Sequence, residues 1–266
     1  MSALLPTRMV EKPWGRDVLP APFKTPAGKR IGEVWFEPPP QLPQLLVKYI
    51  FTSEKLSVQV HPSDAQLPGH GKEECWLVIA AEPGAALGVG FREAISAEAM
   101  RAAALDGSIE QLLAWHPVTS GDFFYIPANT VHAIGGGISL IEVQQTSDVT
   151  YRLFDYGRER ELHLDEGIAV ARGEPHLPSL RVRVPERGSV ALVDGPLFRL
   201  DRIAGVPDAA TAARYGEAAV LVIPMHGEVR VSSERIAPGE CALAASLDDV
   251  ASDASALCLI AQSCGT

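Results

Sequence analysis

The chain has 266 residues, of which 47% are hydrophobic, and its formal net charge is −10. A chain of this length can bury a substantial core in one large or two small domains. The acidic balance argues against nucleic acid as a partner, because phosphate backbones bind to basic surfaces. An anionic ligand would need a local cluster of Lys and Arg that acts against the overall charge.

The cysteine pattern and the hydropathy pattern suggest the compartment. Cys75, Cys241, Cys258 and Cys264 form no Cys-x-x-Cys pair. Cys75 and Cys258 lie in apolar runs, which predicts that both are small buried side chains. The sequence shows no signal-type apolar region and no run long enough to span a bilayer. We therefore expect a cytoplasmic protein with no membrane partner.

Strand-like runs separated by Gly, Pro, Asp or Ser dominate the first part of the chain and predict a mainly β fold. One helical region is predicted over Ser96–Trp115, with Ser96 and Ser108 as N-caps and Gln111 completing a capping box with Ser108. The predicted strands are Gly32–Phe36, Leu45–Phe51, Leu56–Val60, Cys75–Ala80, Phe123–Ile126, Ser139–Val143 and Val149–Phe154.

A polar stretch that contains Pro and Arg, Glu174–Gly188, predicts a connector with a domain boundary near residue 185. We expect one domain over residues 1–185, with a small helical insertion near 96–115, and a second over residues 186–266. The second domain partly echoes the first, but its lone His226 has no nearby partner. It is therefore expected to be a degenerate copy without a metal. Its predicted strands are Ala219–Ile223, Gly227–Val231 and Ala256–Ala261.

Four residues form the most informative pattern in the chain. In Leu56–His61, apolar and polar residues alternate, so Gln59 and His61 share one face of a strand. Glu74 begins the next predicted strand, and pairing of the two strands would bring it opposite them. His132 ends a Gly-x5-Pro-x4-His turn that can return to the same place. Such an N/O ligand set suits zinc, and also manganese, iron or cobalt.

Each of these ligands, taken alone, has an ordinary structural explanation. A histidine before proline is typical of a turn, and a single strand glutamine is typical of a solvated face. A glutamate beside Lys72 and Glu73 is typical of a charged loop. Convergence of all four residues, in this order, is what favours a metal site.

Gln-x-His, then Glu, then Pro-x4-His resembles the two-part cupin signature, with Gln59 in place of the first histidine. Leu-Ser-Val-Gln-Val-His-Pro, Gly-Lys-Glu-Glu-Cys-Trp and Ile-Pro-Ala-Asn-Thr-Val-His-Ala are similar to segments of type I phosphomannose isomerases in their short bacterial form. Lys12-Pro13-Trp14-Gly15 and Gly32-Glu33-Val34-Trp35 resemble N-terminal segments of that family. The resemblance covers roughly residues 10–160.

This resemblance implies cupin jelly-roll (double-stranded β-helix) barrels and one Zn2+ per chain. It also implies a zinc-dependent aldose–ketose isomerase that interconverts mannose 6-phosphate and fructose 6-phosphate through a cis-enediol. The partner would be a small sugar phosphate, and the chain a monomer or weak homodimer. The implied ligands of the metal are Gln59, His61, Glu74 and His132.

The catalytic candidates surround this set. The resemblance places Arg152 in the position of a catalytic arginine that stabilises enediolate charge, and it aligns Asp148 with an acidic residue and Lys72 with a lysine. If Asp148–Arg152 is extended, its ends share a face roughly 13 Å apart. A nearby metal should lower the pKa of Lys72 and make it an acid/base candidate. Glu142 is a further candidate base.

Charge or a hydroxyl group selects the candidate phosphate ligands, which are Ser57, Lys72, Arg152 and Arg158. Both cations also have an ordinary structural explanation. Arg152 can pair with Asp148 or Asp155, and Lys72 can be a solvated charge on a loop.

The sequence departs from the family at one place near the metal. Many relatives have a histidine directly before Lys-x-Glu, where this chain has Gly71, and whether His70 substitutes stays open. The remaining histidines are interpreted as surface or packing residues; with His70 they are His116, His163, His176 and His226.

Two other functions remain open. A cupin oxygenase would hold iron with three histidines, or with two histidines and a carboxylate, and Gln59 in place of a histidine argues against this function. A non-catalytic sugar-binding cupin would keep the fold without turnover, and the departure at Gly71 keeps that option alive.

Overall fold

The computed structural model describes residues 3–264, and most of their regular structure is β-strand, as the sequence predicts. Two antiparallel sheets form a barrel in the first part of the chain. The larger sheet contains, in spatial order, β13 (Arg181–Arg183), β9 (Asp122–Ile126), β6 (Glu74–Ala81), β11 (Ile138–Gln145), β4 (Leu45–Phe51), β3 (Ile31–Phe36) and β2 (Thr7–Arg16). The smaller contains β12 (Tyr151–Phe154), β5 (Val58–Val60), β10 (His132–Ile134), β7 (Ala86–Phe91) and β8 (Leu113–Pro117).

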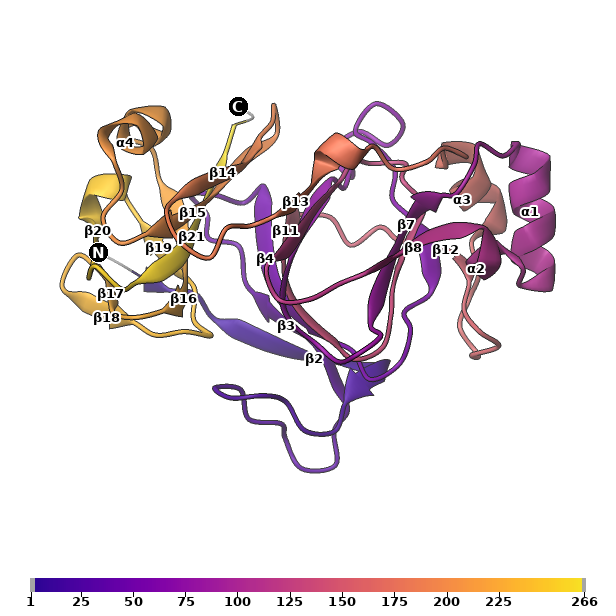
Figure 1. Ribbon diagram of the computed structural model, residues 1–266, viewed down its shortest axis with the longest axis horizontal. Helices are drawn as coiled ribbons and strands as arrows, with labels where there is room; N and C mark the ends of the chain where they lie inside the picture. The colour runs from indigo at the N-terminus through magenta and orange to yellow at the C-terminus, as the bar shows by residue number, and fades with distance from the viewer. Residues whose placement is uncertain (1–2, 265–266) are drawn as a thin grey trace.

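The last third of the chain forms a second β body beside the barrel (Figure 1). Its six-stranded sheet contains, in order, β1 (Ala3–Leu4), β19 (Ala242–Ala244), β16 (Val220–His226), β21 (Leu257–Ser263), β15 (Phe198–Ala204) and β14 (Val190–Asp194). A three-stranded sheet contains β18 (Glu234–Ile236), β17 (Val229–Val231) and β20 (Val250–Ser252). The domain boundary near residue 185 stays a prediction.

Helices are few and short. They are α1 (Ala97–Asp106), α2 (Ile109–Leu112), α3 (Leu164–Val170) and α4 (Ala209–Tyr215), with single 3-10 turns at η1 (Pro178–Leu180) and η2 (Leu247–Asp249). The first three lie on the outer side of the smaller barrel sheet (Figure 1). There Met100 and Ala103 of α1 pack in one cluster with Val58 and Val60 of β5. Because strand side chains alternate between faces, this packing turns Gln59 toward the barrel interior. Within residues 3–264, no helix has the length and apolar character needed to cross a membrane.

The predicted helical region Ser96–Trp115 is correct at its start and wrong at its end. The Ser96 hydroxyl accepts a hydrogen bond from the Ala99 amide at 3.2 Å and caps α1. The Ser108 side chain makes no such bond. The backbone amide of Gln111 donates to the backbone carbonyl of Ser108 instead, so no capping box forms. Leu113–Pro117 is strand β8, paired with β7, because tertiary pairing outweighs local helix propensity.

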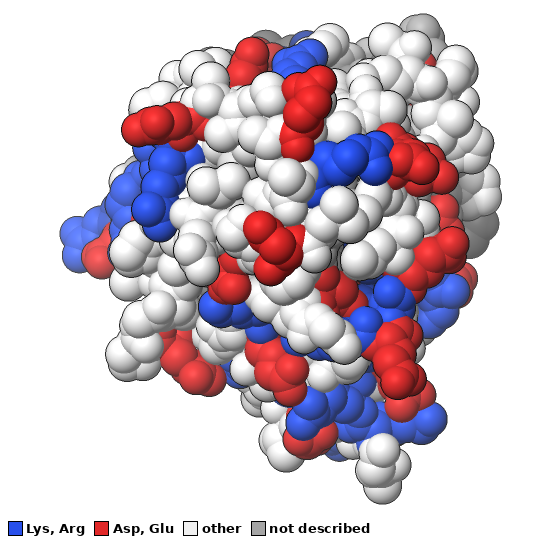
Figure 2. Space-filling model, turned by 90° about the vertical axis from the view of Figure 1, so that its right-hand side faces the viewer, with Lys and Arg blue, Asp and Glu red and all other residues white. Residues whose placement is uncertain are grey.

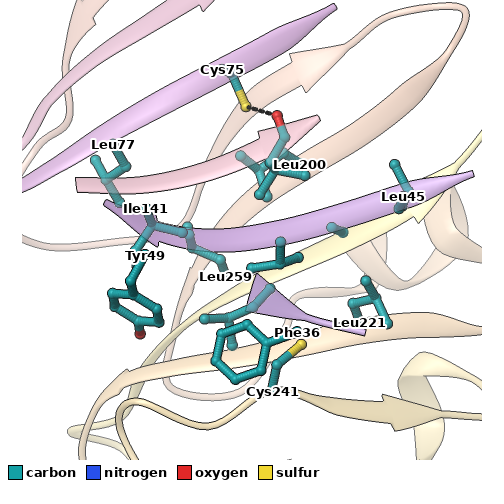
Figure 3. Close-up of a cluster of buried hydrophobic side chains, with 14 of the residues drawn as sticks. Phe36, Leu45, Tyr49, Cys75, Leu77, Ile141, Leu200, Leu221, Cys241 and Leu259 are labelled. Atoms are coloured by element: carbon teal, nitrogen blue, oxygen red, sulfur yellow. Dashed lines mark hydrogen bonds between the residues drawn. The ribbon is translucent and has the colours of Figure 1, made fainter. Parts of the chain in front are cut away.

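Strand β4 shows why the two β bodies hold together. Its residues are all buried, since the sheet that it belongs to is covered on both faces. Tyr49 and Phe51 face outward into a cluster that also contains Leu200, Leu221 and Leu259 from the second body (Figure 3). The hydrophobic core is therefore continuous between the first and last parts of the chain. Cys75 lies in this cluster and Cys258 in a second one; both are buried and free, as predicted.

Candidate functional site

Four predicted residues, carried by both barrel sheets, meet inside the barrel. Gln59 and His132 are direct register partners on β5 and β10, and His61 follows β5. The expected pairing of the strands that carry Gln59 and Glu74 is wrong: β5 pairs with β10 and β12, whereas β6 pairs with β9 and β11. Glu74, the first residue of β6, instead reaches across the barrel from the opposite sheet.

The resulting cluster is compact and excluded from solvent. Glu74 Oε2 lies 3.5 Å from His61 Nε2, and Glu74 Oε1 lies 3.5 Å from His132 Nε2. Each of the three side chains is only 1% exposed. One ligand atom from each residue falls within 4.8 Å of the others, a spacing that suits a single metal ion.

Hydrogen bonds orient both imidazoles toward this centre. His61 Nδ1 lies 2.9 Å from the Val149 carbonyl, and His132 Nδ1 lies 2.9 Å from the Thr130 carbonyl. Because a carbonyl can only accept, each Nδ1 carries the proton and each Nε2 keeps a lone pair. Such backbone-anchored histidines are typical of metal ligands. The bond to Val149 also takes its carbonyl out of the sheet, and β12 begins at Tyr151, not at the predicted Val149.

The Glu74 carboxylate provides the test of whether a cation fits. Both of its oxygens are buried, and neither accepts an aligned hydrogen bond from the described residues. Lys72 Nζ lies 2.9 Å from Oε2 as an ion-pair partner, and Oε1 faces His132. A buried carboxylate with unfilled oxygens is costly, so a divalent cation between Glu74, His61 and His132 suits the donors that are present.

Gln59 lies at the edge of this cluster. Its Oε1 accepts a hydrogen bond from the Ser57 hydroxyl at 3.0 Å, and its Nε2 lies 3.3 Å from His132 Nε2. A rotation of the amide exchanges oxygen and nitrogen. Gln59 can therefore offer its oxygen as the fourth ligand, as the sequence analysis predicts.

The protonation states favour metal binding. Burial, together with the charge of Lys72, holds the pKa of His61 well below its usual range. Burial also lowers the pKa of His132, although Glu74 acts in the opposite direction. Burial alone would raise the pKa of Glu74, but the charges of Lys72, His132 and Lys48 and the hydrogen bond from Lys72 together outweigh burial, and the pKa is lowered. The chain thus presents two neutral imidazoles and one carboxylate at neutral pH.

The expected lowered pKa of Lys72 is not found in the chain itself. Lys72 is buried, with Nζ 3.2 Å from His61 Nε2. Burial lowers its pKa, but the carboxylates of Glu74 and Glu142 together outweigh burial and raise it. The expected decrease of the Lys72 pKa came from the charge of a metal alone, and the two carboxylates act in the opposite direction.

A cavity of about 690 Å³ opens beside the cluster and contains most of the predicted site residues. Both barrel sheets contribute to its walls. The predicted residues that border it are Ser57, Gln59, Lys72, Glu142, Asp148 and Arg152. His61, Glu74 and His132 do not border the cavity themselves. Gln59 and Lys72 border it, and they contact His132 and His61, so the cluster lies directly behind these two side chains.

The predicted catalytic residues are held in different ways. Buried Glu142 accepts hydrogen bonds from Lys48 at 3.0 Å and Trp76 at 2.9 Å. Asp148 is exposed and precedes β12, so Asp148 lies outside the strand that carries Arg152. Arg152 forms neither of the ion pairs considered for it; its Nε donates to the Glu161 carbonyl at 3.0 Å.

Arg158 is the one predicted substrate residue that the structure keeps away from the cavity. Its guanidinium lies 3.1 Å from Asp155 and 3.1 Å from Glu54. His70 is exposed and also lies outside the cavity, so it does not occupy the place of the histidine that relatives have at Gly71. A side chain at Gly71 would collide with Asp64, since an added Cβ meets its backbone nitrogen at 2.4 Å.

Sequence reasoning missed several residues that border the cavity. Buried Lys48 carried a signal: it is the only charge in the apolar run Leu45–Phe51. His163, interpreted as surface or packing, borders the cavity and accepts a hydrogen bond at Nδ1 from the Arg152 amide at 3.3 Å. Arg160 also borders it, but lies in an irregular turn with no periodic signal. The remaining charged or aromatic residues along its wall are Arg8, Glu11, Lys12, Trp14, Glu33, Trp35, Trp76 and Tyr151.

Comparison with known proteins places this geometry in context. No family model matches the chain. A mannose-6-phosphate isomerase from Streptococcus mutans is 46% identical over 136 residues, covering 47% of this chain and 43% of that relative. The solved mannose 6-phosphate isomerase of Bacillus subtilis has a TM-score of 0.77 at 21% identity, covering 97% of this chain and 98% of that one. A zinc-bound mannose 6-phosphate isomerase has a TM-score of 0.71 at 14% identity, covering 98% and 99%.

Sequence and fold carry different weight in these matches. The aligned segments cover 43% to 55% of the curated relatives, so the chain spans about half the length of the relatives that it matches. The solved structures, at 21% identity or less, show the fold, and their cupin architecture confirms the predicted one. The chain thus resembles the mannose-6-phosphate isomerases in sequence over part of its length and has the cupin fold of the phosphomannose isomerases over nearly all of it.

Proposed function

We propose that this protein is a zinc-dependent aldose–ketose isomerase that interconverts mannose 6-phosphate and fructose 6-phosphate. One observation carries the proposal: two neutral imidazoles and a carboxylate that accepts no aligned hydrogen bond converge directly behind Gln59 and Lys72, which border a cavity of about 690 Å³. The similarity to mannose-6-phosphate isomerases supports the substrate, and the zinc-bound structural neighbour supports the metal.

His61, Glu74 and His132 would hold the metal, with Gln59 as a fourth ligand. When bound, zinc supplies Lewis-acid polarisation of the oxygens on C1 and C2 of the open-chain sugar. All of the other steps belong to side chains of the cavity.

The reaction moves one carbon-bound proton from C2 to C1 and one hydroxyl proton from O2 to O1, and Lys72 would relay the second by giving a proton to O1 and taking one from O2. We assign the carbon-bound proton to Glu142, whose carboxylate borders the cavity and keeps lone pairs beyond its bonds to Lys48 and Trp76. From mannose 6-phosphate, Glu142 takes the proton from C2 and returns it to C1 through the cis-enediol. Lys72, whose pKa is raised by Glu74 and Glu142 despite burial, is protonated before and after this relay.

Arg152 would balance the negative charge that develops on the enediol oxygens, because its terminal guanidinium nitrogens are free to donate into the cavity. Asp148, at the exposed end, would bind a sugar hydroxyl. The Ser57 hydroxyl lies on the cavity wall beside Gln59 and is retained as a substrate contact. Arg158 is the weakest member of the predicted set, since it does not border the cavity.

A coupled assay tests the function directly. The purified protein should convert mannose 6-phosphate, lose this activity in EDTA and recover it when zinc is added back. Glu74→Gln is the matched variant: it keeps the shape of the side chain and removes the charge, so zinc should not restore it. A zinc-loaded protein that converts no hexose 6-phosphate would contradict the proposal.

Two histidines and one carboxylate are also the donor set of non-haem iron oxygenases, which keeps that class as the second candidate. Elemental analysis and oxygen uptake separate the two: iron with oxygen consumption would favour the oxygenase. Arg152→Ala addresses a role in sugar binding alone. Loss of turnover with sugar binding retained supports catalysis, whereas an unmodified protein that binds sugar without turnover supports binding only.

A further inference from the structure

Two arginines from neighbouring segments border the same cavity. Arg152 belongs to β12 and is the register partner of Gln59, so it lies next to the metal cluster. Arg160 follows in the turn after β12 and borders the same cavity. The turn reverses through Tyr156 and Gly157, whose φ angles are 56° and 78°. This reversal returns the chain toward the cavity that β12 has just left.

Asp155 fixes the direction of Arg160. Arg160 Nε lies 2.6 Å from one carboxylate oxygen of Asp155, and Nη2 lies 2.7 Å from the other. Asp155 is 2% exposed, so this two-bond fork is largely dry and holds the guanidinium plane in one orientation. Nη1 of Arg160 makes no hydrogen bond to any residue in 3–264, and the group is thus partly unused.

Arg152 is held by one end only. Its Nε donates to the Glu161 carbonyl at 3.0 Å, while Nη1 and Nη2 have no hydrogen-bond partner among the described residues. Burial and then the charge of Arg160 lower the pKa of Arg152. The second cause means that the two guanidinium groups are close enough to repel each other, and an anion between them would relieve this repulsion.

Acidic neighbours do not cancel this charge. Asp155 is shared by Arg158 and Arg160, so one carboxylate faces two cations. Three of the carboxylates that border the cavity are each paired with a lysine: Glu11, Glu33 and Glu142. Asp148, which is exposed, also borders the cavity and is the acidic group that an incoming anion would meet.

We propose that Arg160 binds the phosphate group of the sugar substrate together with one terminal nitrogen of Arg152, whose other terminal nitrogen serves the enediol oxygens, and that Arg160 sets the preference for a phosphorylated over an unphosphorylated sugar. A phosphate monoester offers several acceptor oxygens, which matches the terminal nitrogens of two guanidinium groups. On the face that carries α1 and α3, acidic and basic side chains are interspersed (Figure 2). We assign the attraction to the two arginines that border the cavity. The choice of ligand rests on the function proposed above.

Titration of the purified protein with inorganic phosphate, followed by calorimetry, tests the pair without requiring turnover. Arg160→Ala should weaken phosphate binding about 10- to 100-fold, the cost of a charge-assisted hydrogen bond. Arg160→Lys keeps the charge, loses the fork and should give an intermediate affinity. Arg101→Ala, which removes an exposed arginine outside the cavity, controls for net charge and should leave the affinity unchanged.

Arg158→Ala tests the alternative that any cation paired with Asp155 affects phosphate binding, because Arg158 is the other cation on that carboxylate. If it weakens phosphate binding as much as Arg160→Ala does, or if Arg160→Ala has no effect, the assignment is overturned. Circular dichroism checks the fold of each variant, and Arg160→Lys alone still separates charge from fork if Arg160→Ala does not fold.

The isomerase assay separates this inference from the function on which it rests. Arg160→Ala should lower kcat/KM for mannose 6-phosphate at least about tenfold more than it lowers kcat/KM for mannose, which has no phosphate. An active enzyme whose kcat/KM for both sugars is unaffected overturns the phosphate assignment and leaves the function intact. An inactive protein whose phosphate binding depends on Arg160 leaves the anion site intact and contradicts the function.

Discussion

Gln59 and His132 lie directly opposite each other on β5 and β10, and their Nε2 atoms are 3.3 Å apart. The pairing fixes one histidine ligand against the amide that the sequence singles out. We expect Gln59→Leu, which keeps the volume and removes the amide, to weaken zinc binding at least about tenfold. A competition titration with a chelating dye measures this. Ser57→Ala, which removes only the hydrogen bond to Oε1, should have the smaller effect, and equal zinc affinities for Gln59→Leu and the parent would exclude Gln59 as a ligand.

Zinc binding should also stabilise the fold. A ligand that binds only the native state at about a thousand times its Kd adds about 4 kcal/mol to the free energy of unfolding. Urea unfolding with and without EDTA measures the difference. Glu74→Gln is the control, because chelator should leave its stability unchanged. Identical unfolding curves for the parent protein in both conditions would show that no tight metal site exists.

Lys48 is the buried partner of Glu142, with Nζ 3.0 Å from the carboxylate. Lys48→Met leaves that carboxylate buried without its cation, which should cost about 3–5 kcal/mol of unfolding free energy. Combining it with Glu142→Gln should recover part of the loss, because no unpaired charge remains. Denaturant unfolding of the two single variants and the double variant measures the coupling, and additive losses would mean that the ion pair contributes nothing.

The residues of the candidate metal site could be predicted because each one has a local signal. Alternation places Gln59 and His61 on one strand face, and the turn residues before His132 predict that the chain reverses there. That Glu74 comes from the opposite sheet could not be predicted, since strand pairing depends on contacts far apart in sequence. The same reason hides the partner of Lys48. The lone charge in an apolar strand indicates a buried lysine, but Glu142 is 94 positions away.

Irregular segments set the other limit. Arg158 and Arg160 are chemically alike, and only the turn after β12 decides that the second faces the cavity and the first does not. No periodicity describes that turn. Trp115 shows the converse error, because an Ala- and Leu-rich context predicts helix there and pairing of β8 with β7 overrides it.

Gly71 is required by the close approach of Asp64. The Gly71 amide donates to Asp64 Oδ1 at 2.9 Å, and an added Cβ would lie 2.4 Å from the Asp64 backbone nitrogen. Gly71→Ala should therefore displace the loop and cost about 1–3 kcal/mol, and it should weaken zinc binding because Lys72 and Glu74 follow directly. Urea unfolding and zinc titration measure both effects. A fully stable Gly71→Ala protein would mean that the loop yields without cost.

Asp201 gives a pH dependence that lies outside the metal site. Burial raises its pKa from 3.8 to about 6, against the opposing charge of Arg214. Between these two values the folded state holds a proton that the unfolded state has released, so this contribution to stability is lost as pH rises from about 4 to about 6. The stability of Asp201→Asn relative to the parent should therefore rise over that range. Unfolding free energies at a series of pH values measure it, and a constant difference would contradict the raised pKa.

The outward face of β4, which places Tyr49 and Phe51 against Leu200 and Leu259, makes the two β bodies thermally inseparable. Unfolding of one body would expose the apolar contact face of the other to water. A calorimetric scan should therefore show one endotherm. Among the described residues of the C-terminal body, no group suits a metal ion. Its role is then to cover the apolar face of the barrel. A chain without the C-terminal body would leave this apolar face of the barrel exposed to solvent and free to associate with other apolar surfaces.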